Sequence, residues 1–279
     1  DFNVGAEYNY MDKAGNVQLI EEIFGNGDAG SISQFYYYDA SDPTEKVYAG
    51  PVWDYDRTMG NPVAWQLQSY NVFYANRLHV NPEYDTPWLF CLCQKEAFSQ
   101  AVAEQYSTVF LPLLKQYLEE EIDSYTEWIY QAAQMNELRW GYVEENYSDS
   151  IDNMIQYMNA RIEFLNKVWL EKRPYYRVLT NQSMGNNYAN YIIFSGESFL
   201  ELPDFENSQW QTFKGWYYKD SNEPFDITKP ITEDIEIYAK WEDKDTRTTN
   251  QILKLIPLGV IAMMGLGLLI SDLGKPRRS

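Results

Sequence analysis

The chain has 279 residues, of which 41 are Asp or Glu and 22 are Lys or Arg, so its formal net charge is -19. A chain this acidic repels nucleic acid phosphates, and we expect no nucleic acid partner. Hydrophobic residues make up 45% of it, which is enough for a buried core and excludes a disordered chain.

The first predicted elements are a helix and a glycine-rich loop. The sequence begins at Asp1 without a methionine, a signal peptide or a strand-glycine-strand lead-in, so we expect it to be the C-terminal portion of a longer protein. Residues 17–24 predict a short amphipathic helix, and residues 25–30 predict a tight loop because three glycines and an Asn allow unusual backbone angles. The switch from helix to loop leaves Asp28 in the open.

Two short strands are predicted next, over residues 33–38 and 47–53, with a turn over residues 40–46 between them. The second strand ends in an aromatic, glycine-bounded segment that carries Asp54 and Asp56. The unit therefore reads as loop, strand, turn, strand, loop, with acids in both loops.

The acids of this unit are the candidate functional residues. The two intervening strands bring the loops of Asp28 and Asp54 side by side, and an extended backbone turns Tyr55 away and leaves Asp54 and Asp56 on one face. A phosphoryl-transfer site needs a cation held by carboxylates and a separate carboxylate that accepts the acceptor's proton. Asp28 and Asp54 fit that division, and the amide oxygen of Gln34 is an acceptable further ligand for a hard cation.

The same acidic residues also suit other kinds of site. Paired acids also serve glycoside hydrolysis, and acids in a loop also bind a calcium ion that only stiffens the loop. The spacing of the acids does not separate these alternatives. A histidine mechanism depends on His79, the single histidine, and we do not expect one. Cys91 and Cys93 are the only cysteines, which excludes a disulfide framework and a four-ligand zinc site, and we expect both thiols to be buried.

Helical periodicity begins at Pro87 and continues to Leu113, with Pro112 expected to kink or split the helix. A second helix is predicted over residues 123–135. A third begins at the N-cap signal of residues 148–150. The apolar positions of the third helix form a core stripe: Ile151, Met154, Ile155, Met158, Ile162, Leu165 and Val168.

From Pro174 the pattern changes to β-branched and aromatic segments separated by turn residues. Residues 235–241 alternate between apolar and polar, which predicts a strand with one buried face, and residues 220–224 predict a turn. We expect a separate small β-rich module here. Residues 252–272 are apolar enough and, at about 31 Å, long enough to span a membrane if Lys254 snorkels outward.

The predicted organisation is α+β and has five parts. They are residues 1–173, the β-rich module 174–242, a linker 243–251, a transmembrane helix 252–272 and a short basic tail 273–279. Because the tail is too small to be the working end, we expect a single-pass membrane protein whose bulk is extracellular.

Residues 17–61 resemble the spore-coat protein H (CotH) kinase family. The resemblance rests on the segments around Asp28, on the aromatic run 33–38 and above all on Gly-Pro-Val-Trp-Asp-Tyr-Asp at residues 50–56. Residues 136–140 and the helix with Arg161 resemble the helical C-terminal part of that family. The match covers about residues 1 to 170.

This resemblance implies an atypical protein-kinase-like fold that uses ATP and Mg²⁺, or another divalent cation, to phosphorylate hydroxyl side chains of secreted or surface proteins. By position, Asp28 matches the catalytic-loop acid and Asp54 the metal-binding acid, with Asp56 a second metal candidate and Gln34 a weaker contact in the cofactor site. The family's nucleotide-binding N-terminal part is not among these residues, so we expect this fragment alone to be inactive. The alternative is a catalytically silent surface adhesin or scaffold.

The β-rich module resembles the internalin-type B-repeat, a small β-grasp-like unit of bacterial surface proteins. The likeness lies in residues 212–217 and 231–241. It implies a role in spacing or adhesion, with the module between an enzyme and a membrane span.

Overall fold

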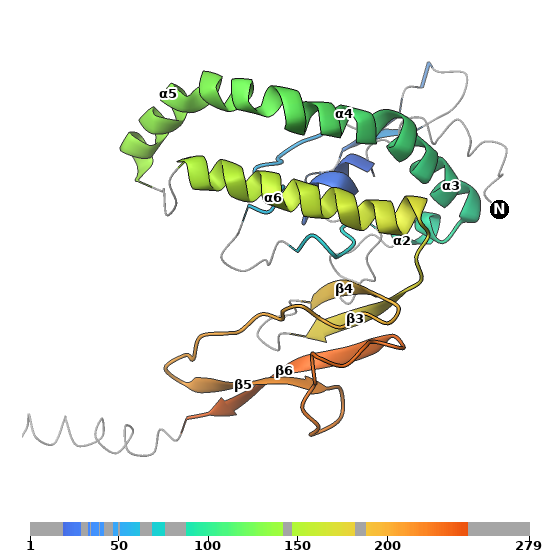
Figure 1. The fold of residues 1–279 in the computed structure, drawn as a ribbon, viewed down its shortest axis with the longest axis vertical. Helices are drawn as coiled ribbons and strands as arrows, with labels where there is room; N and C mark the ends of the chain where they lie inside the picture. Colours follow the sequence, from blue (N-terminus) through green and yellow to red (C-terminus); the bar gives the residue numbers. More distant parts are fainter. Residues whose placement is uncertain are drawn as a thin grey trace, which may run out of the picture.

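The structure is a computed structural model. It describes residues 19–28, 33, 35–38, 40–41, 47–49, 51–61, 69–75, 88–141, 147–181 and 188–244. Long helices form one layer and a small sheet lies beside them, so the chain is α+β (Figure 1). A kinase-like arrangement and the five-part division of the chain stay predictions.

The acidic loops flank a two-stranded sheet, as predicted, but the strands are shorter than expected. Residues 19–24 are helical, and β1 (Tyr36–Tyr38) pairs antiparallel with β2 (Val47–Ala49). The prediction that the second strand reaches Trp53 was wrong. Pro51 has no N–H to donate to a strand ladder, and residues 51–61 form a loop.

The helices follow one another with few interruptions. They are α2 (Trp88–Cys93), α3 (Glu96–Gln105), α4 (Leu111–Gln116), α5 (Ile122–Trp140) and α6 (Tyr147–Leu165), with π-helical turns η1 (Tyr106–Phe110), η2 (Tyr117–Glu121) and η3 (Asn166–Leu170). Pro112 was predicted to kink or split the helix, and it stands in the first turn of α4, directly after η1. The backbone stays helical through this junction, so the split is a change from π-helical to α-helical hydrogen bonding and not a break in the chain of helices. Gly141, at a φ of 65°, ends α5 in the left-handed conformation.

The core stripe of α6 is confirmed in its C-terminal half. Met158, Ile162 and Leu165 are buried in the helical core, whereas Ile151, Met154, Ile155 and Val168 are half-buried. The expectation that both cysteines are buried was wrong, because Cys91 is exposed and Cys93 is half-buried. Cys91 lies on the outward face of α2, a surface helix of six residues.

A four-stranded sheet occupies the C-terminal part of the described chain. It contains β3 (Tyr175–Asn181), β4 (Tyr188–Phe194), β5 (Gln211–Tyr218) and β6 (Ile235–Asp243) in the order β4-β3-β6-β5, and only the β3–β6 pair is parallel. The strand predicted from alternation is confirmed as β6, where Ile237 and Ala239 are 0% and 1% exposed.

The sheet shares its core residues with the helices through β4. Tyr191 and Ile193 lie in the core of the sheet, whereas Ile192 and Phe194 lie in the helical core. Because successive side chains of a strand point to opposite faces, β4 contributes one face to each core. Residues 69–75 run alongside it, and the Ile192 amide donates to the Asn71 carbonyl at 2.8 Å. The sequence did not predict this shared strand.

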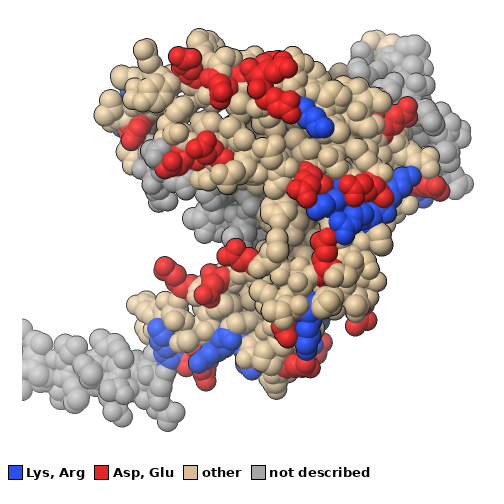
Figure 2. Space-filling model, in the orientation of Figure 1, with Lys and Arg blue, Asp and Glu red and all other residues tan. Residues whose placement is uncertain are grey.

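Acidic side chains gather on one side of the molecule, over α4 and α5, in the view of Figure 2. Glu119, Glu120 and Asp123, at the start of that region, are exposed.

Within the described residues, no helix combines the length and the apolar character needed to cross a membrane. The predicted span 252–272 and the tail 273–279 lie outside those residues.

Candidate functional site

The first acidic loop begins where the first helix ends. The helix of residues 19–24 ends at Gly25, which has a φ of 69°, and the Asn26 amide donates to the Glu21 carbonyl at 2.9 Å. The Asn26 side chain then accepts a hydrogen bond from the Asp28 amide at 3.1 Å, which closes an Asx turn. Asp28 is thereby held, half-buried, at the end of a fixed turn.

The loop 51–61 presents the other two acids to solvent. Asp54 and Asp56 are exposed, and Asp54 has a φ of 65°, a left-handed conformation that Asp tolerates better than most residues. The Thr58 hydroxyl donates to the Tyr55 carbonyl at 2.7 Å, and the Asn61 side chain donates to the Asp56 carbonyl at 2.6 Å. These bonds hold the backbone of the loop through its own side chains.

The bases of the two acidic loops are joined. The Met59 amide donates to the Phe24 carbonyl at 2.7 Å. Tyr157 of α6 packs against both Gly25 and Gly60, and neither glycine has room for a Cβ because of that side chain. The two intervening strands predicted that the loops lie side by side. Contact with α6 is a further cause of this arrangement.

A buried polar cluster lies between the loops. Glu21 and Asn26 are each 1% exposed, and the half-buried Tyr55 approaches both of them. Burial, followed by the Glu21 carboxylate, raises the pKa of Tyr55 well above its usual range. Burial and then Glu21 also raise the pKa of Tyr36, to about 12. Both hydroxyls therefore keep their protons at neutral pH.

A buried ion pair anchors the helix that carries this site. Arg161 is 0% exposed, and its Nη2 contacts Glu22 Oε1 at 2.5 Å. The guanidinium also donates to the carbonyls of Glu22, Tyr70 and Val72 at 2.6 to 3.0 Å. The Glu22 carboxylate accepts the Tyr74 and Ala75 amides at 2.8 and 2.9 Å. Every charge of this pair is thus hydrogen-bonded, as buried charges require.

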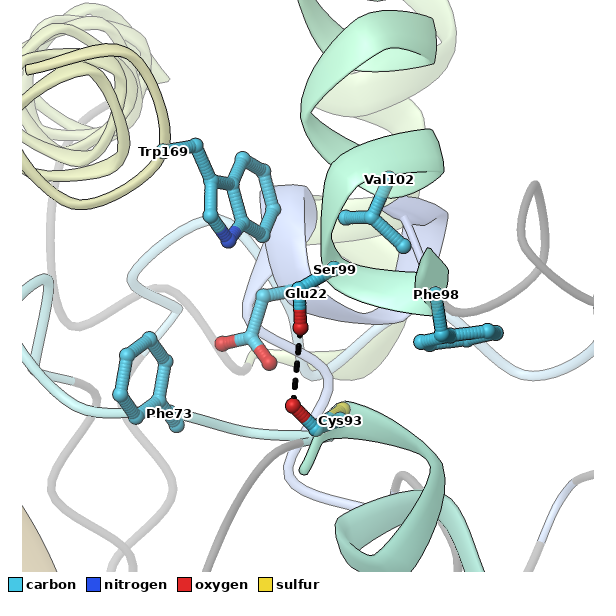
Figure 3. A pocket seen from close by; sticks show the side chains of 7 residues that line it. All are labelled: Glu22, Phe73, Cys93, Phe98, Ser99, Val102 and Trp169. Atoms are coloured by element: carbon cyan, nitrogen blue, oxygen red, sulfur yellow. Dashed lines mark hydrogen bonds between the residues drawn. The ribbon is translucent and has the colours of Figure 1, made fainter. Parts of the chain in front are cut away.

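A small cavity lies beside Glu22 of this ion pair, and none of the residues that line it belongs to the acidic loops (Figure 3). At about 30 Å³ it has room for one or two water molecules and not for a nucleotide. The Ser99 hydroxyl donates to the Cys93 carbonyl at 2.8 Å at its edge. The cavity is lined by Glu22, Phe73, Cys93, Phe98, Ser99, Val102 and Trp169.

The predicted site residues fall partly within the described chain. Asp28, Asp54 and Asp56 lie on the two joined loops, whereas Gln34 and His79 lie outside the described residues. The Ser33 hydroxyl lies 3.5 Å from Asp54 Oδ2, which is long for a hydrogen bond. Among the residues that the structure describes, no three His, Cys, Asp or Glu side chains are grouped so as to hold a metal ion.

The donor chemistry of the exposed pair nevertheless suits magnesium. Mg²⁺ is usually held by one or two carboxylates together with phosphate oxygens and water, and it does not need a cage of protein ligands. Asp54 and Asp56 supply two carboxylates that reach solvent. Their role as metal ligands remains a prediction.

Several residues of the site were missed by sequence reasoning. Glu21, Asn26 and Tyr55 form the buried polar cluster, and Tyr157 holds the two glycines. One signal was available for Glu22, because two consecutive acids stand in the middle of a short helix that is otherwise apolar. Buried charges of this kind are paired, and the partner, Arg161, interrupts the apolar stripe of α6.

Comparison with known proteins places residues 14–165, more than half of the chain, in the range of the family model described as CotH kinase protein. The matched range contains both acidic loops and all of α2 to α6. No curated protein and no solved structure matches the chain.

Proposed function

The chain belongs to the CotH kinase protein family, and on this premise we propose that it is part of a kinase that transfers a phosphoryl group from ATP to hydroxyl side chains of secreted or cell-surface proteins. The observation that carries the proposal is the pair of acidic loops, which lie inside the matched range and are hydrogen-bonded at their bases. A kinase-like activity agrees with the family description.

In the proposed mechanism Asp28 accepts the proton of the acceptor hydroxyl. The hydroxyl oxygen forms a bond to the γ-phosphorus of ATP, while the bond between the γ-phosphorus and the β-phosphate oxygen breaks. Asp54 and Asp56 are the proposed ligands of a divalent cation, which neutralises the charge of the phosphates when bound. Gln34 is proposed to contribute an amide oxygen to the same cofactor site. ADP and a phosphorylated side chain are the products.

We propose further that the sheet of β3 to β6 acts as a spacer and that residues 252–272 anchor the protein in a bacterial membrane, with its bulk outside. This agrees with the likeness of the sheet region to surface-protein repeats and with the apolar composition of that stretch. Protein substrates on the outer surface then lie within reach of the kinase site.

The test is phosphoryl transfer from labelled ATP by the complete protein, including any sequence that precedes Asp1. We expect Asp28→Asn to lower the rate by about 10² to 10⁴, the usual contribution of a general base. Asp152→Asn, an exposed acid on α6, is the matched control and should leave the rate unchanged. A protein that binds ATP and transfers nothing, with or without Asp28, would instead be the silent scaffold.

A further inference from the structure

The helix α5 is exposed along nearly its whole length. Of its 19 residues only Ile122 is buried, and the helix lies on the side of α6 that faces away from the sheet (Figure 1). Large apolar side chains of a surface helix normally pack against a neighbouring element. On α5 several of them are exposed instead: Tyr125 by 48%, Trp128 by 79%, Ile129 by 44% and Met135 by 66%.

These exposed side chains share one face of the helix. Together with the exposed Ala132 they recur at intervals of three, four and seven residues, which places them above one another on a helical surface. We name this set, Tyr125, Trp128, Ile129, Ala132 and Met135, the α5 apolar face. The Tyr117 ring of η2 extends it, because its centroid lies 5.7 Å from that of the Tyr125 ring.

The neighbouring helix α6 contacts a different face of α5. The Tyr147 hydroxyl donates to the Thr126 carbonyl at 2.8 Å, and the Tyr147 and Tyr130 rings lie 5.4 Å apart. Thr126 and Tyr130 each follow a residue of the α5 apolar face by one position, which turns them about 100° away from it. The packing of α6 therefore does not explain why α5 carries an apolar face.

Negative charge accompanies the α5 apolar face. Residues 116–138 include acids and neither Lys nor Arg, and acidic side chains gather over this region in Figure 2. Asp123 and Glu127 are both exposed, stand one helical turn apart, and Glu127 directly precedes Trp128. An apolar row beside acids is complementary to a partner that carries an apolar row beside Lys and Arg.

The same charge argues against two other occupants. A second copy of this chain would bring the acids of its own α5 against Asp123 and Glu127, and like charges across an interface oppose association. A membrane surface with anionic lipids attracts basic segments and repels acidic ones. The charge and the apolar row together favour a basic protein segment.

We propose that the α5 apolar face is a docking surface for a basic amphipathic helix of another protein. Such a helix lays its apolar side chains along a row of anchors spaced by three, four and seven residues. Trp and Tyr carry most of the binding energy in interfaces of this kind, so Trp128 is the expected centre. This docking does not depend on the proposed kinase chemistry, because α5 contains none of the acids assigned to it.

The experiment measures binding of a fluorescently labelled helical peptide, with Leu on one face and Lys on the other, to the complete protein by anisotropy. We expect Trp128→Ala to raise Kd by about 30-fold and to leave the melting temperature unchanged, because Trp128 is 79% exposed. The matched control is Trp210→Ala. Trp210 is a 56% exposed Trp that directly precedes β5, and its removal should change neither quantity.

The contribution of charge is measured with the double variant Asp123→Asn and Glu127→Gln. We expect Kd to rise by about 2- to 10-fold at low salt and the difference to shrink at high salt, because salt screens exposed charges. The matched control is Glu201→Gln together with Glu206→Gln, which removes two exposed acids before β5 and should leave Kd unchanged.

The peptide controls decide the chemistry of the partner. Replacing the Lys residues of the peptide with Glu, or its Leu residues with Ser, should abolish binding. Binding that survives the Leu replacement, or that Trp128→Ala leaves unchanged, overturns the proposal because charge alone is then responsible. Absence of binding by the Leu and Lys peptide also overturns it. Dimers in sedimentation that disappear in Trp128→Ala would assign this face to a second copy and overturn the basic partner.

Discussion

Two glycines set how closely α6 approaches the acidic loops. A Cβ on Gly60 would lie 2.8 Å from the Tyr157 ring, and Gly60 has a φ of 80°. Two independent constraints therefore favour glycine at position 60: the positive φ, and the lack of room for a Cβ beside Tyr157. These two requirements can be measured separately, because Gly196 has a φ of 84° with nothing within 4 Å of its Cβ position.

We expect Gly196→Ala to lower the free energy of unfolding by about 1 to 2 kcal/mol, the cost of the left-handed conformation alone. Gly60→Ala should cost a further ~1 to 3 kcal/mol, because the added methyl group overpacks against Tyr157. Urea unfolding of the two variants measures the difference. Equal losses would mean that Tyr157 moves aside and does not hold the loops together.

At the scale of elements, the contact between α6 and the first helix depends on one guanidinium. Arg161, on α6, donates to the Glu22 carbonyl of the first helix and to the carbonyls of Tyr70 and Val72. Its partner Glu22 in turn holds two amides of the same neighbouring segment. Three segments that are distant in the sequence therefore meet at one ion pair.

We expect Arg161→Met to lower the free energy of unfolding by about 3 to 5 kcal/mol, because it leaves the buried Glu22 carboxylate without its counter-charge. The matched control is Lys214→Met, which removes the surface pair with Glu242 at 2.7 Å and should change little, because both side chains are largely exposed. Chemical denaturation measures both. A similar small effect for Arg161 would contradict its anchoring role.

At the scale of the whole molecule, β4 ties the helices to the sheet. Its side chains alternate between the two cores, so neither core is complete without it. Ile192 and Ile237 offer a comparison at equal burial, at 1% and 0% exposure, with the first in the helical core and the second in the core of the sheet. Both belong to the same sheet.

We expect Ile192→Ala to speed hydrogen exchange in α6 as well as in β3 and β4, although the residue lies in a strand. Ile237→Ala should speed exchange in β3 and β6 and leave α6 protected. Each substitution costs about 2 to 5 kcal/mol through the cavity that it leaves, so the location of the change, and not its size, decides the result. Unchanged protection of α6 in Ile192→Ala would show that the two cores are independent.

Local patterns account for much of what was predicted correctly. Alternation of apolar residues predicted β6, and the missing N–H of Pro112 predicted the change of helix type between η1 and α4. The strand ending at Trp53 was overestimated because aromatic and β-branched residues favour strands even where Pro51 prevents further pairing. Such patterns predict the conformation of a segment but do not predict which other segment it contacts.

The amino-acid sequence alone is enough to predict the α+β character, the main helices, the acidic loops and the likeness to the CotH kinase family, which the matched range confirms. The contact of Tyr157 with both loops and the sharing of β4 between two cores could be seen only in the folded chain. Periodicity follows from neighbours along the chain, whereas these contacts join residues far apart in sequence and depend on burial and shape.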